Sequence, residues 1–129
     1  MTRTPKHLLF IIERGGYAIP MEQFKQAGYA VTVEQSVRKA LAALKSLRPD
    51  VIVAEFNYGP KYGVQISNLE PLLARVQTAH AGAKVIVFTE REFSHHLDKL
   101  RTRFAIFDVL TYPVEKETLL GSVARATEA

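Results

Sequence analysis

Polar residues that could do acid or ligand chemistry follow three apolar runs of the sequence. They are Glu13 after residues 8–12, Glu55 after residues 51–54, and Thr89 after residues 85–88. An apolar run without alternation is typical of a strand covered on both faces, as in a parallel sheet. The carboxyl edge of such a sheet is where open α/β proteins place their ligand sites. Glu55 therefore lies where a functional carboxylate is expected.

Other residues that could bind a metal or a phosphate form no convincing site. His95 and His96 are adjacent, so on a helix they point about 100° apart, and no second cluster of ligands accompanies them. We interpret them as surface side chains. The glycines of residues 59–63 and of residues 15–16 are too sparse for a phosphate-binding loop, and they predict turns.

The elements that must position the polar residues alternate between strand and helix. Strands are predicted at residues 8–12, 29–33, 51–54, 85–88 and 106–110. Helices are predicted at residues 21–27, 36–48, from Ser67 to near Gly82, 93–104 and around 119–123. Residues 29–33 alternate apolar and smaller side chains, which favours a strand nearer the sheet edge. Ser67 and Glu70 have the spacing of a capping box.

Length and composition favour a single α/β domain over residues 1–129. The chain is 47% hydrophobic and has no cysteine, which excludes disulfides and thiolate metal sites. No apolar stretch approaches the roughly 20 residues of a membrane span, and no signal segment follows the N-terminus, so we expect a soluble cytoplasmic protein with no membrane contact. A net charge of +4 permits contact with nucleic acid or acidic protein without selecting either.

Three segments resemble the motifs of a response-regulator receiver domain of the CheY type. They are Pro49 to Asn57 (PDVIVAEFN), Lys84 to Thr89 (KVIVFT) and Phe107 to Pro113 (FDVLTYP). The resemblance covers nearly the whole chain. It implies a flavodoxin-like, doubly wound, five-stranded parallel sheet of order 2-1-3-4-5 with helices on both faces. It also implies a role in two-component or phosphorelay signalling, in which a histidine kinase phosphorylates an Asp.

The same resemblance implies a degenerate phosphorylation pocket. Glu55 matches the Asp that is phosphorylated in the family, and Glu13 and Arg14 match the acidic pair that binds magnesium. Thr89 matches the Ser or Thr that would hydrogen-bond the phosphoryl group. Tyr112 replaces the family's lysine at the end of the fifth strand, and the proline that follows it is retained as Pro113. Arg14 places a positive charge where magnesium needs an anion, and the Tyr112 phenol is normally neutral. The extra methylene of Glu55 also displaces its carboxylate, and an error of about 1 Å can cost about a hundredfold in rate.

These departures lead to expectations about the pocket. We expect no cofactor, weak or absent magnesium binding, and no phosphorylation of Glu55. One hypothesis is that Glu55 contacts Thr89, Arg14 or Tyr112, so that a fixed bond replaces the phosphoryl contact. The alternative is that Glu55 points into water.

The sequence is compatible with three functions. The first is a noncatalytic pseudo-receiver that binds a protein partner or itself. The second is an atypical receiver that a histidine kinase still phosphorylates. The third is a nucleic-acid-binding protein that uses Lys99, Arg101 and Arg103, although no binding motif supports it. By resemblance, Lys99, Arg103 and Val109 belong to the partner surface of the fourth helix, fifth strand and fifth helix; ordinary solvent-exposed charge is the alternative.

Overall fold

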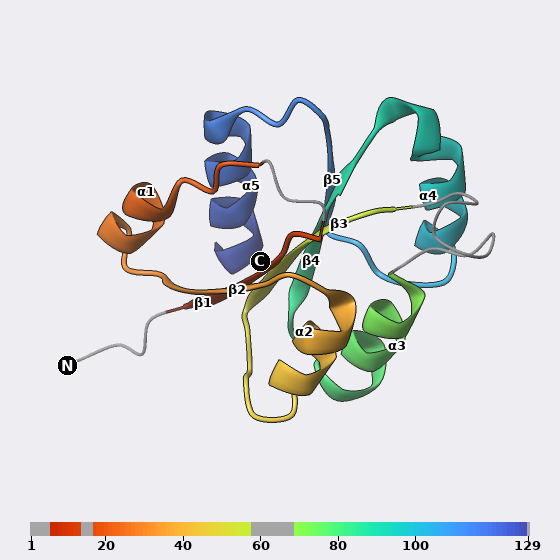
Figure 1. The fold of residues 1–129 in the computed structure, drawn as a ribbon, viewed down its shortest axis with the longest axis horizontal. Helices are drawn as coiled ribbons and strands as arrows, with labels where there is room; N and C mark the ends of the chain where they lie inside the picture. The colour runs from red at the N-terminus through yellow and green to blue at the C-terminus, as the bar shows by residue number, and fades with distance from the viewer. Residues whose placement is uncertain (1–5, 14–16, 58–68, 129) are drawn as a thin grey trace.

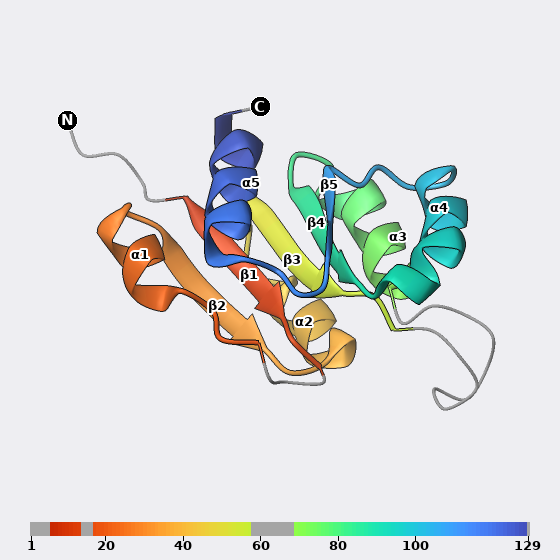
Figure 2. The same ribbon diagram turned by 90° about the horizontal axis from the view of Figure 1, so that it is seen from above.

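The computed structural model describes residues 6–13, 17–57 and 69–128, which form one parallel sheet with helices on both faces. The sheet order is β2-β1-β3-β4-β5, as predicted (Figure 2). The strands are β1 (His7–Ile11), β2 (Ala30–Glu34), β3 (Val51–Glu55), β4 (Lys84–Thr89) and β5 (Asp108–Thr111). The helices are α1 (Met21–Gln26), α2 (Val37–Ala43), α3 (Glu70–Ala79), the 3-10 turn η2 (Arg91–Phe93), α4 (Ser94–Arg101) and α5 (Lys116–Glu128).

Two hydrophobic cores lie on opposite faces of the sheet. Helices α1 and α5 cover one face, and α2, α3 and α4 cover the other (Figure 1). Successive residues of a strand point to opposite faces, so Ile52 packs under α2 to α4 whereas Val51 and Val53 pack under α1 and α5. The apolar runs of the central strands lack alternation because both faces are buried.

Helix α2 follows directly from its sequence. The Ser36 hydroxyl accepts a hydrogen bond from the Lys39 amide at 3.1 Å, which satisfies one of the unpaired N–H groups of the first turn. Val37, Ala40 and Leu44 are buried, at the three- and four-residue steps of one helical face. The basic side chains are left in solvent: Arg38, Lys39, Lys45 and Arg48.

Three predicted helix limits were wrong. Helix α2 ends at Ala43, whereas the sequence predicted a helix to residue 48. Helix α3 begins at Glu70 with Leu69 as its N-cap, so Glu70 is the first helical residue and not the third residue of a capping box; Ser67 lies outside the described residues. Helix α4 ends at Arg101, although the apolar stripe continues to Phe104. The Phe104 amide still donates to the Leu100 carbonyl at 2.9 Å, which keeps its ring against the core beyond the helix end.

Within the described ranges, no helix is both long and apolar enough to cross a membrane.

The Ser36 cap can be tested by substitution. We expect Ser36→Ala to lower the free energy of unfolding by about 1 kcal/mol, because an amide of the first turn of α2 loses its acceptor. Urea denaturation measures the change. Ser46→Ala is the matched control, since Ser46 is exposed in the turn after α2 and caps no helix. Equal losses in both variants would contradict the capping role.

Candidate functional site

The carboxyl edge of the sheet brings together polar residues that are far apart in sequence. Glu55 is the last residue of β3, Thr89 is the last of β4, and Tyr112 follows β5 directly. Glu13 lies two residues after β1. Because β1, β3, β4 and β5 are parallel neighbours, all four residues reach the same edge.

The Glu55 carboxylate bridges the ends of two other strands. Its Oε1 accepts a hydrogen bond from the Glu13 amide at 2.7 Å, and its Oε2 accepts one from the Tyr112 hydroxyl at 2.8 Å. The residue is 4% exposed. The contact with Tyr112, one of three partners considered from the sequence, is confirmed, and the alternative that Glu55 points into water is wrong.

The Glu13 carboxylate turns toward helix α2. Its Oε1 accepts a hydrogen bond from the side-chain amide of Asn57 at 3.1 Å, and its Oε2 accepts one from the Val37 amide at 3.3 Å. Val37 is the first residue of α2, where a negative charge is favourable for the helix dipole. All four carboxylate oxygens of Glu13 and Glu55 therefore accept hydrogen bonds.

Asn57 is a site residue to which the sequence analysis gave no role. It is 3% exposed, and it follows the buried strand β3 by two residues. A polar side chain so close to a buried strand needs hydrogen-bond partners, and this requirement was the available signal. Its partner could not be identified from sequence, since Glu13 is 44 residues away.

Thr89 and the aromatic residues complete the described part of the site. The Thr89 hydroxyl is buried and donates to the Glu90 carbonyl at 3.1 Å, so it is turned to its own backbone rather than to Glu55. The Tyr112 ring packs edge-on against Phe88, with centroids 5.8 Å apart. The peptide between Tyr112 and Pro113 is cis. Arg14 lies outside the described residues.

Phe88 also contacts a second tyrosine. The Tyr17 ring packs edge-on against it, with centroids 4.9 Å apart. Burial raises the pKa of the Tyr17 phenol, and the nearby Glu115 carboxylate raises it further. The Phe88 ring therefore contacts the rings of both Tyr17 and Tyr112. The hydroxyl of Tyr112 is the one that donates to Glu55.

The three residues predicted for a partner surface have different environments. Lys99 is exposed on α4, and Val109 on β5 is half-buried against the core under α2 to α4. Arg103 forms an ion pair with Glu70 of α3 at 2.6 Å. Its guanidinium also lies 5.0 Å from the centroid of the Phe104 ring. Arg103 therefore links the chain segment after α4 to helix α3.

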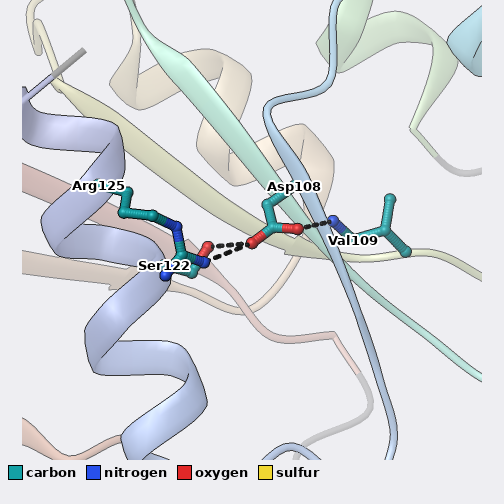
Figure 3. Close-up of polar contacts among 4 residues, drawn as sticks. All are labelled: Asp108, Val109, Ser122 and Arg125. Atoms are coloured by element: carbon teal, nitrogen blue, oxygen red, sulfur yellow. Dashed lines mark hydrogen bonds and ion pairs between the residues drawn. The ribbon is translucent and has the colours of Figure 1, made fainter.

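Asp108 connects β5 to α5, a contact that the sequence analysis missed (Figure 3). Its Oδ2 accepts hydrogen bonds from the Ser122 hydroxyl at 2.7 Å and from the Arg125 guanidinium at 3.2 Å. Its Oδ1 accepts one from the Val109 amide at 2.9 Å. The signal was a serine on the apolar stripe of α5, because the buried Ser122 hydroxyl requires a partner.

The residues that the structure describes contain no group of three or more His, Cys, Asp or Glu side chains that could hold a metal ion. His95 and His96 lie edge-on, with ring centroids 5.9 Å apart.

The fold is that of response-regulator receiver domains. A response regulator from Thermotoga maritima superposes with a TM-score of 0.76 and 15% identity, covering 98% of this chain and 100% of that one. A response regulator receiver domain protein from Clostridium thermocellum gives 0.73 and 17%, covering 95% and 94%. The chemotaxis response regulator CheY4 of Vibrio cholerae gives 0.68 and 24%, covering 95% and 99%. No protein-family model and no curated protein matches the sequence.

The bond between Tyr112 and Glu55 can be tested by removing one oxygen. We expect Tyr112→Phe to lower the free energy of unfolding by about 2 kcal/mol, because a buried carboxylate loses a donor. Tyr29→Phe is the control, since its hydroxyl lies 3.3 Å from the neutral Thr127 hydroxyl. We expect the control to lose less than about 1 kcal/mol. Urea denaturation measures both variants. Equal losses in the free energy of unfolding would contradict a larger contribution from the Tyr112–Glu55 bond than from the Tyr29–Thr127 contact.

The Asp108 contacts allow a second test. We expect Ser122→Ala to cost about 1 kcal/mol or more, because its buried hydroxyl bonds a carboxylate. We expect Arg125→Ala to cost less than about 0.5 kcal/mol, because an exposed ion pair is screened by water. Thermal and urea denaturation measure both variants. A larger loss in Arg125→Ala would contradict this order.

Proposed function

We propose that this chain is a noncatalytic pseudo-receiver, a signalling module that acts in a two-component or phosphorelay context in the cytoplasm. It works through contact with a protein partner, or with a second copy of itself, and this contact does not depend on phosphorylation. The receiver fold over nearly the whole chain supports the signalling context. The polar contacts at the carboxyl edge support the loss of phosphorylation.

The hydrogen bond between Tyr112 and Glu55 is the observation that carries the proposal. It occupies Oε2 at 2.8 Å, while the Glu13 amide occupies Oε1. A phosphoryl acceptor must present a carboxylate oxygen in line with the donor, and the transferred group needs positive charge around it. Tyr112 stands where the resemblance places a lysine, and its phenol supplies a hydrogen bond without a charge.

Magnesium does not fit the described donor set. The ion prefers octahedral coordination by oxygen, usually from carboxylates together with waters. The pocket offers the carboxylates of Glu13 and Glu55, whose oxygens are held by amides, a phenol and the N-terminus of α2. Turning Glu13 toward a metal would remove its bonds to Val37 and Asn57. We therefore propose that the site works without a metal.

The face formed by α4, β5 and α5 is the proposed contact surface. Lys99 supplies exposed charge there, and Val109 supplies a half-buried apolar side chain. Asp108 holds α5 against β5 through Ser122, so the two elements form a fixed surface. Arg103 contributes to the position of α4 through its ion pair with Glu70. A fixed surface suits a module whose partner contact is set by folding.

Labelling with a small phosphodonor tests the proposal. We expect no stable label on the wild-type chain after incubation with radiolabelled phosphoramidate and magnesium, because Glu55 is bonded on both oxygens. We also expect no robust label on the Glu55→Asp, Tyr112→Lys variant with Arg14 intact, because Arg14 opposes the metal. Labelling of this variant would show that Arg14 does not block the metal.

The second candidate function is the outcome that contradicts the proposal. If the wild-type chain takes up label and Glu55→Gln does not, Glu55 is a phosphoryl acceptor and the chain is an atypical receiver. A known active receiver, treated in parallel, establishes that the donor and the metal are competent.

A further inference from the structure

Exposed cations lie on helix α2, on the turn that follows it and on α3. Residues 35–49 contain four basic residues, Arg38, Lys39, Lys45 and Arg48, and no Asp or Glu. Arg75 on α3 adds a fifth. All five are exposed, and none has an ion-pair partner in the described ranges 6–13, 17–57 and 69–128. We call Arg38, Lys45, Arg48 and Arg75 the basic α2–α3 surface. Lys39 is left out because it points about 100° away from Arg38 on the helix.

Two arginines outside this surface are paired with carboxylates. Arg103 is paired with Glu70, and Arg125 is paired with Asp108. The region of Lys99, Arg101 and Arg103, which the sequence suggested for nucleic acid, therefore has one of its three charges offset. None of the four cations of the basic α2–α3 surface is paired with a carboxylate of the residues that the structure describes.

Two of the cations act on a common neighbour. His80, the C-cap residue of α3, is buried, and the Leu44 carbonyl at the end of α2 acts on the pKa of its ring by raising it. Arg48 donates to the same carbonyl at 3.2 Å, so it is held beside the histidine. Burial lowers the pKa of His80 first, and the charges of Arg48 and Arg75 lower it further. The two arginines thus create a positive potential where the ends of α2 and α3 meet.

One carboxylate lies at the margin of this surface. Asp50 lines a cavity of about 350 Å³ together with Arg48 and His80. Its Oδ2 accepts a hydrogen bond from the His7 amide at 2.8 Å, so this oxygen is turned toward β1. The Glu13 carboxylate lies at the other end, where it accepts a hydrogen bond from the Val37 amide. Two carboxylates leave the four-cation surface with a positive balance.

The side chains between the cations favour phosphate over a protein partner. The exposed residues there are small: Ala42, Ser46, Ala74 and Thr78. Protein interfaces need an apolar or aromatic centre, and the described residues of α2 and α3 expose no large apolar side chain. Neither α2 nor α3 contains an aromatic residue, so neither offers a platform on which unpaired bases could stack.

We propose that the basic α2–α3 surface binds the phosphate backbone of double-stranded nucleic acid without reading its sequence. Arg38 lies on α2, and Lys45 lies in the hydrogen-bonded turn that follows the helix end at Ala43. Seven residues at about 1.5 Å each correspond to about 10 Å. A duplex presents about six charges over that length, at about one per 1.7 Å. The net charge of +4 adds long-range attraction. This activity is separate from the pseudo-receiver function and does not depend on it.

Salt-dependent binding to a duplex tests the proposal. Fluorescence anisotropy with the full chain and a labelled DNA duplex of arbitrary sequence measures affinity from about 50 to about 200 mM salt. Four phosphate contacts predict a slope of about −3.6 in log affinity against log salt, about −0.9 for each contact. We expect Arg48→Gln with Arg75→Gln to make the slope shallower by about two. Both residues are exposed, and circular dichroism verifies folding.

The matched control removes the same charge elsewhere. Lys99→Gln with Arg101→Gln also lowers the net charge by two, from exposed positions on α4. We expect this variant to keep the wild-type slope. Equal changes in the two double variants would overturn the proposal, because binding would then follow net charge alone.

Further outcomes separate the classes of ligand. Absence of duplex binding at about 50 mM salt would overturn the proposal. Tighter binding to single-stranded DNA, or to a polyglutamate peptide at equal ionic strength, would also overturn it. In a nuclear magnetic resonance titration, we expect the pKa of His80 to rise in the duplex complex, because phosphates offset Arg48 and Arg75. An unchanged pKa would place the duplex on another face.

Discussion

A buried carboxylate must be satisfied by hydrogen bonds, and at the end of β3 this requirement organises the whole carboxyl edge of the sheet. Glu55 meets it with the Glu13 amide from the chain after β1 and with the Tyr112 hydroxyl from the chain after β5. Strands that are not neighbours in the sheet are thereby connected through one side chain. The carboxylate that could have accepted a ligand is part of the protein's own structure.

The same requirement explains how several helices are attached. Glu13 bonds the first amide of α2, and Asp108 bonds the buried Ser122 of α5. Each contact joins a polar group that packing would otherwise leave unsatisfied. As a consequence, α5 is held against β5 by hydrogen bonds from Ser122 and Arg125 to the Asp108 carboxylate. The α2–α3 side of the molecule carries exposed cations that have no ion-pair partner among the described residues.

The sequence predicted the elements well because their signals are local. The runs at residues 8–12 and 51–54 correspond to β1 and β3 within one residue at each end. The errors lie at helix ends, where the apolar pattern of the sequence continues beyond the last helical residue. The apolar stripe reaches Phe104 although α4 ends at Arg101, because one further hydrogen-bonded turn keeps the ring on the core.

By itself the sequence determined the five-stranded α/β fold and which polar residues lie at the strand ends, because hydrophobic periodicity and the order of elements are properties of neighbouring residues. Tertiary structure decided which groups meet. Tyr112 reaches Glu55 across 57 residues, and Thr89 turns to its own backbone. Arg103 pairs with Glu70, whereas Arg38 and Lys39 of α2 have no ion-pair partner in the part of the chain that the structure describes. These choices depend on the convergence of distant chain segments, which no local pattern encodes.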